Sequence, residues 1–247
     1  MLRVDQALVA RGLCGSREKA KRAIMAGQVR LNHRLVHKPN EGVRGTDRLT
    51  LVEQEKYVSR GGLKLEHAMR YFQMDVRDGT AIDLGASTGG FTDCLLQHGA
   101  AKVYAVDVGR GQLAWKLRHD PRVVVMEKTN ARDLTSAKFP APFSPVDLAV
   151  IDCSFISLCK ILPAAIALLR DLGSILALIK PQFEAGRTEA DKGRGVITDP
   201  TIHERVVGEI ENHVRNQADM QWRGIIESPL MGPAGNKEFF ALIEKNR

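Results

Sequence analysis

From residue 80 onward, short runs of apolar residues alternate with segments in which apolar residues recur every three or four positions. Such runs predict β-strands, and such segments predict amphipathic helices. The predicted strands cover residues 80–84, 102–107, 122–126, 146–151 and 173–180, and the predicted helices cover 91–98, 110–119, 157–171 and 202–217. This alternation favours a mainly parallel sheet with helices on both faces. Two last strands, near 222–228 and 237–243, have no helix between them and should pair antiparallel. The pattern predicts an α/β fold with a seven-stranded sheet that ends in an antiparallel hairpin.

The first 55 residues follow a different pattern and predict a small α+β domain. A short amphipathic stretch ends at Gly12, and Ser16 is a good N-cap for a second helix over 17–26. Strand-like segments follow at 29–33 and 48–52. The next residues read as a linker that ends in a glycine pair. We therefore expect domains at 1–55 and 63–247, joined by a linker at 56–62.

Positive charge is concentrated at the start of the chain. The net charge is +7, but residues 1–64 hold 14 Lys and Arg against 6 Asp and Glu, whereas the remainder holds 22 against 23. A basic module beside a neutral body indicates a polyanionic partner, because Lys and Arg near phosphates release condensed counterions. A merely solubilising basic terminus is the alternative, but such a tail would lack the apolar periodicity seen here.

The remaining composition argues against several classes of protein. The longest apolar run, residues 161–169, is far shorter than the roughly 20 residues of a membrane helix, and no signal peptide is recognisable. The four cysteines form no Cys-x-x-Cys pair, so neither a disulfide framework nor a metal site is expected. These features predict a reduced, cytoplasmic protein without a metal.

A glycine-rich turn follows the first predicted strand of the second domain, in Ala81-Ile-Asp-Leu-Gly-Ala-Ser-Thr-Gly-Gly-Phe91. Glycine lets a backbone approach a ligand closely, and open α/β sheets bind ligands at the carboxyl ends of their strands. The spacing matches neither the dinucleotide motif nor the P-loop. It resembles the first motif of S-adenosylmethionine-dependent methyltransferases. This resemblance implies that S-adenosylmethionine binds at the turn, and the implied residues are Asp83, Gly85, Ser87, Gly89, Gly90 and Phe91.

Two further carboxylates lie where the rest of such a cofactor would bind. Asp107 ends the second strand, 24 residues after Asp83, and a carboxylate there can accept both ribose hydroxyls of a nucleoside. Asp133 follows the third strand, and its loop would lie beside the adenine edge. A solvent-exposed aspartate at a strand end is the plainer alternative for Asp107.

Asp152 and Lys180 end the fourth and fifth strands, at the same sheet edge as the glycine turn. A hydroxyl is a weak nucleophile at neutral pH and benefits from a positioned base when it attacks a methyl group. A lysine that ends an apolar strand is partly desolvated, which favours its neutral form. Lys180 is thus a candidate base, and Lys64, at the start of a helical run, is a candidate helper. A structural Lys–Asp ion pair is the alternative.

The four residues Lys64, Asp152, Lys180 and Glu238 match, in order and context, the Lys-Asp-Lys-Glu tetrad of FtsJ-like ribose 2′-O-methyltransferases. With the basic module in front, the whole chain resembles the TlyA (haemolysin A) family. Matching phrases include Ser59-Arg-Gly-Gly-Leu-Lys-Leu, Ile151-Asp-Cys-Ser-Phe-Ile-Ser and Gly232-Pro-Ala-Gly-Asn-Lys-Glu-Phe-Phe240. The resemblance implies a Rossmann-like methyltransferase fold, catalysis by the tetrad, and 2′-O-methylation of cytidines in ribosomal RNA, free or in ribosomal subunits. DNA and membranes are not expected partners, and the oligomeric state is open.

The amino-acid sequence of the N-terminal segment is similar to that of the RNA-binding domain first seen in the fourth small-subunit ribosomal protein. The similarity lies in Leu2-Arg-Val-Asp-Gln-Ala-Leu and in Ser16-Arg-Glu-Lys-Ala-Lys-Arg-Ala-Ile. It implies that RNA backbone is contacted by Arg3, Arg17, Lys21 and Arg22. Solvated helix charges are the alternative.

Other functions share parts of this pattern. A membrane-active haemolysin is suggested only by the family name. A pseudouridine synthase can carry the same N-terminal module, but the glycine turn and the parallel strands contradict its fold. A non-catalytic RNA-binding protein would have no need for all four tetrad residues. In amino-group methyltransferases the fourth strand commonly ends in an Asn/Asp-Pro-Pro-aromatic motif, whereas Asp152-Cys-Ser-Phe155 stands at that place here.

Overall fold

The computed structural model describes residues 1–52 and 55–247, and the chain divides into two compact units, Met1–Glu55 and Lys56–Arg247. Each unit has an apolar core of its own. None of the helices in the described residues combines the length and the apolar character that crossing a bilayer requires.

The N-terminal unit packs two helices, α1 (Val4–Ala10) and α2 (Arg17–Met25), against short strands. The strands are β1 (Leu2–Arg3), β2 (Val29–Leu31), β3 (Arg34–Leu35), β4 (Gly42–Val43) and β5 (Leu49–Leu51). They pair as β1–β4 and as the three-stranded sheet β3–β2–β5. The Ser16 side chain accepts a hydrogen bond of 3.2 Å from the backbone N–H of Lys19, as expected for an N-cap. Apolar residues from both helices and from β2, β4 and β5 form the core of this unit.

The second unit is built on a seven-stranded sheet with the order β11–β12–β10–β9–β6–β7–β8. Its strands are β6 (Thr80–Leu84), β7 (Lys102–Val106), β8 (Val123–Met126), β9 (Val146–Ile151), β10 (Leu169–Ile179), β11 (Met220–Glu227) and β12 (Phe239–Lys245). The five strands from β6 to β10 run parallel, and β12 pairs antiparallel with both β10 and β11. The predicted α/β fold with a terminal antiparallel hairpin is therefore confirmed.

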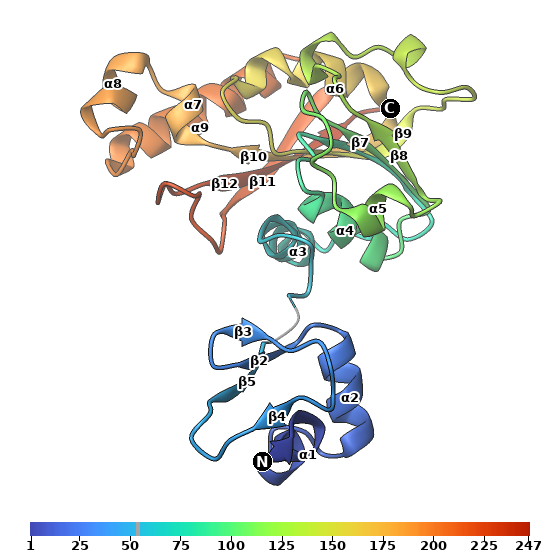
Figure 1. Cartoon of the computed structure of the whole chain (residues 1–247). Coiled ribbons are helices and arrows are strands. Elements are labelled where there is room, and N and C mark those ends of the chain that lie inside the picture. Colours follow the sequence, from blue (N-terminus) through green and yellow to red (C-terminus); the bar gives the residue numbers. More distant parts are fainter. Residues whose placement is uncertain (53–54) are drawn as a thin grey trace. The chain divides into compact units, whose positions relative to one another are not determined.

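Helices cover both faces of this sheet (Figure 1). The described helices are α3 (Gly61–Tyr71), α4 (Gly90–Gln97), α5 (Trp115–Arg118), α6 (Leu162–Leu168), α7 (Pro181–Glu184), α8 (Arg187–Lys192) and α9 (Pro200–Arg215), with 3₁₀ turns η1 (Ala131–Asp133), η2 (Ser136–Lys138) and η3 (Leu158–Lys160). One apolar cluster joins α3 and α4 to the sheet, and another joins α6 and α9 to it. The inner parallel strands are thus buried between two helical layers, which explains their nearly continuous apolar sequence, whereas β8 at the sheet edge is only partly buried.

Two local expectations differ from the structure. The helix predicted over 110–119 is only one turn long, because Gly111 has a left-handed backbone (φ = +71°) and its N–H donates to Glu127 at 2.7 Å. Residues 56–62, predicted as a linker, instead pack on the second unit. Tyr57 is buried against Gly62, where a Cβ would overlap the Tyr57 ring, and the N–H of Val58 donates to Asp93 at 2.8 Å.

Candidate active site

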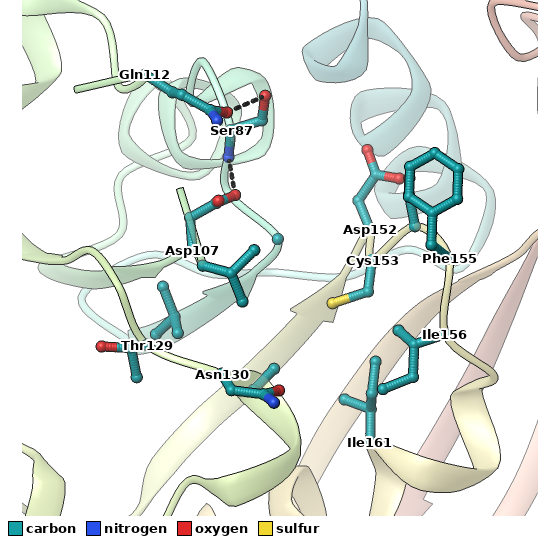
Figure 2. A pocket seen from close by; sticks show the side chains of 15 residues that line it. Ser87, Asp107, Gln112, Thr129, Asn130, Asp152, Cys153, Phe155, Ile156 and Ile161 are labelled. Carbon is teal, nitrogen blue, oxygen red and sulfur yellow. Dashed lines mark hydrogen bonds between the residues drawn. The ribbon is translucent and has the colours of Figure 1, made fainter. Parts of the chain in front are cut away.

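A cavity of about 360 Å³ opens at the carboxyl ends of β6, β7 and β9. After β6 the chain continues on one side of the sheet to β7, whereas β9 pairs with the other edge of β6. Open α/β sheets bind their ligands at such a reversal of strand order. Figure 2 shows Asp107, Thr129 and Asn130 on one side of the cavity and Asp152 and Phe155 on the other. The volume is within the range of small-molecule sites.

Two glycines of the turn have a backbone conformation that favours glycine. Gly85 has φ = +88°, and a Cβ there would come within 2.7 Å of the carbonyl oxygen of Asp152. Gly89 has φ = +94°, immediately before α4. Both positions are strained for any residue with a side chain. The turn can therefore pass closely between the cavity and the end of β9.

Asp107 is held in the cavity wall by the backbone of neighbouring loops. Its Oδ2 accepts from the N–H of Ser87 at 2.8 Å (Figure 2), and its Oδ1 accepts from the N–H of Gly109 at 2.7 Å. A carboxylate has about four acceptor positions, so two remain. They suit the two hydroxyls of a ribose.

Asp83 lies beneath the turn and does not line the cavity. Its Oδ2 accepts from the N–H and the hydroxyl of Thr92, at 2.9 and 2.6 Å, which joins the end of β6 to α4. Burial raises the pKa of the Asp83 carboxyl to about 7. Gly90 and Phe91 are also buried away from the cavity, and the Phe91 ring packs 5.9 Å from that of Phe240. Of the predicted residues of the turn, only Gly85 and Ser87 reach the cavity.

Asp133 is likewise outside the cavity lining, and its side chain is exposed. The loop after β8 contributes Asn130 and Ala131 instead. Asn130 also receives a hydrogen bond of 3.0 Å from the backbone N–H of Arg132, which orders the loop. Pattern reasoning found the loop but chose its charged residue rather than the amide that enters the site.

The candidate catalytic residues form two ion pairs. Nζ of Lys180 lies 2.6 Å from Oδ1 of Asp152, a close ion pair without well-aligned hydrogen-bond geometry, and 2.9 Å from the hydroxyl of Ser154. Nζ of Lys64 lies 2.5 Å from Oε2 of Glu238. Lys64 and Lys180 are each 8% exposed, and Glu238 is 1% exposed.

The sheet register brings these two pairs to one edge. Ile179 in β10 is paired antiparallel with Phe239 in β12, so Lys180, just after β10, lies opposite Glu238, just before β12. Ile151 is paired with Ala177, which places Asp152 beside the end of β10. Four residues spread over 175 positions of sequence therefore lie at the same carboxyl edge.

Phe155 is a site residue that sequence reasoning missed. It lines the cavity, its side chain is 89% exposed, and its φ is +64°. A left-handed backbone in a bulky, exposed apolar residue is costly and points to a functional constraint. Its ring lies 4.9 Å from that of Phe183. Burial raises the pKa of the neighbouring Cys153 thiol to about 12, which disfavours its thiolate form.

The predicted RNA-contacting residues of the N-terminal unit differ in their surroundings. Arg3 and Arg17 both bind the carboxylate of Asp5. Lys21 lies 3.7 Å from Glu18. Arg22 is exposed on α2 and has no ion pair among the described residues.

The cavity fits S-adenosylmethionine by the chemistry of its walls. Asp107 offers the two free acceptor positions that a ribose diol needs. Val106, Ile156 and Ile161 supply apolar surface for a purine, and Asn130 adds an amide to the lining. Asp152 lines the same cavity and pairs with Lys180, so the cavity reaches the candidate catalytic residues.

Comparisons with known proteins agree with this geometry. The model of the FtsJ-like methyltransferases matches residues 57–245, and that of the S4 domain matches residues 2–49. The chain is 46% identical to the 16S/23S rRNA (cytidine-2′-O)-methyltransferase TlyA of Mycobacterium tuberculosis, over 96% of this chain and 88% of that protein. It is 42% identical to hemolysin A of Brachyspira hyodysenteriae, over 97% and 98%.

A solved structure of a candidate hemolysin from Streptococcus thermophilus is 45% identical and superposes with a TM-score of 0.74, covering 99% of this chain and 88% of that one. The matches span both units. The chain therefore belongs to the FtsJ-like methyltransferase family, in the group of TlyA and hemolysin A, and is a methyltransferase whose cofactor is S-adenosylmethionine.

Proposed function

We propose that this protein transfers a methyl group from S-adenosylmethionine to the ribose 2′-oxygen of cytidine in ribosomal RNA. The observation that carries the proposal is the pair of buried lysine–carboxylate contacts at the sheet edge, beside a cavity that holds Asp107. The N-terminal unit adds an S4 domain, and residues 1–55 hold an excess of positive charge, 11 Lys and Arg against 6 Asp and Glu. The TlyA relative of M. tuberculosis, which this chain matches over nearly its whole length, is named for the same reaction.

The two ion pairs have different roles in this reaction. When bound, S-adenosylmethionine supplies an electrophilic methyl on a sulfonium; the new C–O bond forms as the S–C bond breaks. Lys180, in its amine form, accepts the proton of the attacking 2′-hydroxyl. Asp152 at 2.6 Å and Ser154 at 2.9 Å stabilise the resulting ammonium. Lys64 in α3, held by Glu238 just before β12, orients the ribose.

Phe155 supports the choice of a nucleotide acceptor. An exposed aromatic ring at the rim of the cavity, three residues after Asp152, offers a stacking face for an unpaired base. Stacking on protein aromatics contributes about 1–3 kcal/mol per base and suits bases removed from their helix. The acceptor ribose would then lie between this ring and Lys180.

The decisive experiment incubates the full-length protein with methyl-labelled S-adenosylmethionine and with ribosomal RNA or isolated 30S and 50S subunits. Digestion and mass spectrometry locate the label. We expect 2′-O-methylcytidine, and we expect a transcript with 2′-deoxycytidine at the mapped position to accept no label. Label on a base, or transfer to the deoxy transcript, would contradict ribose methylation while leaving the methyltransferase family unaffected.

A further inference from the structure

Asp5 is a completely buried carboxylate in the most basic part of the chain. Its side chain is 0% exposed, although residues 1–64 carry 14 Lys and Arg. Arg3 binds it in a bidentate way, Nε to Oδ1 at 3.0 Å and Nη2 to Oδ2 at 3.3 Å. Arg17 donates to the same Oδ2 at 3.1 Å. Two guanidinium groups from different segments, one before α1 and one at the start of α2, thus meet at one oxygen.

The arginines themselves remain open to solvent. Their side chains are 46% and 53% exposed. A guanidinium carries five N–H donors. Arg3 uses two of them on Asp5 and keeps three, and Arg17 uses one and keeps four. The buried carboxylate therefore fixes the orientation of both groups without consuming their capacity to bind an anion.

The two arginines favour the ionised form of Asp5. Its hydrogen bond with Arg3 is the largest influence and, with that of Arg17, outweighs burial and lowers the pKa of the carboxyl. The carboxylate also accepts the N–H of Gln6 at 3.0 Å, which fixes it to the first turn of α1. The anchor is thus rigid as well as charged.

We propose that Arg3 and Arg17 form a single preorganised site for a backbone phosphate of RNA, and that Asp5 is its positioning residue. The inference rests on the proposed RNA substrate and deepens it by assigning one phosphate to two converging arginines. A free arginine side chain loses its rotational freedom when it binds. Here that loss occurs on folding, so a phosphate meets two forks already aligned.

This role predicts a result opposite to that of simple electrostatics. If only net charge mattered, removal of any carboxylate from the basic unit would strengthen RNA binding. If Asp5 positions the arginines, Asp5→Asn weakens binding although the unit becomes more positive. The asparagine amide would direct a donor at a guanidinium, which has no acceptor.

The matched control is Glu18→Gln. Glu18 lies in the same unit, and its substitution by Gln removes the same charge. In contrast to Asp5, Glu18 is exposed, and its ion pair with Lys21 is long, at 3.7 Å. With 23S ribosomal RNA transcribed in vitro and the full-length protein, we expect Asp5→Asn to weaken binding about tenfold, while Glu18→Gln leaves it unchanged or strengthens it. Binding of Asp5→Asn equal to or tighter than wild type would overturn the positioning role.

A second variant separates positioning from folding. Arg3→Lys/Arg17→Lys keeps both the net charge and Asp5 but removes the planar forks. Circular dichroism and amide NMR spectra report whether the N-terminal unit stays folded in each variant. We expect the double variant to lose affinity as well; wild-type affinity there overturns the inference even if Asp5→Asn unfolds. Failure of the wild-type protein to bind any RNA would instead refute the proposed function.

Discussion

The two units use carboxylates against cations in opposite ways. In the N-terminal unit the acid is buried and the cations are exposed, since Asp5 is inaccessible while Arg3 and Arg17 are about half exposed. In the methyltransferase unit the cations themselves are buried, as Lys64 and Lys180 are each 8% exposed. An exposed cation whose side chain is held by a buried carboxylate can bind a phosphate. A buried lysine beside a carboxylate can instead hold or exchange one proton at a defined atom.

The residue types follow the same division. Arginine stays charged and presents a fixed fork, which suits anion recognition. Lysine changes its protonation state more easily when it is desolvated, which suits acid–base chemistry. The comparison predicts that an arginine cannot replace the buried lysine, and that the cost of breaking a pair depends on its burial.

The largest expected effect is on catalysis at Lys180. Lys180→Met removes the amine but keeps an apolar stem, and we expect methyl transfer to fall by about 10²–10⁴ with little change in S-adenosylmethionine affinity. Single-turnover transfer to ribosomal RNA measures the rate, and calorimetry measures cofactor binding. Lys160→Met is the matched control, because Lys160 is exposed at the end of η3.

Lys180→Arg tests the chemistry of the same position. The guanidinium stays protonated and cannot accept a proton, so this variant should fail as well. A rate close to wild type in Lys180→Arg would show that the residue acts only as a positive charge. The general-base role would then be wrong, while the methyltransferase assignment would stand.

The second prediction concerns the stability of the buried pair. Glu238→Gln leaves Lys64 buried without its counter-charge, which should lower the free energy of unfolding by about 3–5 kcal/mol. Glu227→Gln breaks the ion pair between Glu227 and Lys237, and both of these side chains are about half exposed. This substitution should lower the free energy of unfolding by less than about 1 kcal/mol. Urea unfolding compares the two variants. Equal losses would show that burial does not distinguish these ion pairs.

The third prediction concerns the cofactor. Asp107→Asn removes charge-assisted hydrogen bonds to a ribose diol and weakens the hold on Ser87 and Gly109, so S-adenosylmethionine binding should lose about 1.5–3 kcal/mol. Asp133→Asn should leave the affinity unchanged, because Asp133 is exposed outside the cavity lining. Calorimetry on both variants decides; a loss only in Asp133→Asn would restore the sequence-based assignment of the adenine contact.

Sequence periodicity predicted the sheet, and with it the edge at which the site lies. Parallel strands end at a common edge, so the positions of Asp107, Asp152 and Lys180 after apolar runs were enough to place them together. The pairing of the last two strands followed from the missing helix between them. These inferences depend on backbone periodicity alone, which is strong in buried strands.

The details that escaped prediction depend on contacts between distant segments. Asp5 binds Arg17 only because α1 packs on α2, and nothing in the spacing of the two residues indicates this. Phe155 was missed because an apolar residue after a strand normally continues into the core, whereas here it is exposed with a left-handed backbone. Asp83 was placed at the ligand, but its carboxylate binds Thr92 beneath the turn.

The last prediction sharpens the comparison through pH. Burial raises the pKa of Asp83 to about 7, above the value near 3.9 of an unfolded chain, so the folded protein holds a proton that the unfolded chain has lost between about pH 4 and pH 7. The stability contributed by this carboxyl should therefore decline as pH rises through that interval. The lowered pKa of Asp5 has the opposite effect on stability, because the stability that this carboxylate contributes is lost as pH falls.

Thermal unfolding of wild type and Asp83→Asn across this range isolates the effect of Asp83, since asparagine does not titrate. We expect the wild-type melting temperature to decrease relative to that of the variant from pH 4 to pH 7 and to stay level above it. Parallel profiles for the two proteins would show that Asp83 is ionised throughout, and the contrast with Asp5 would then lie in exposure of the cations alone.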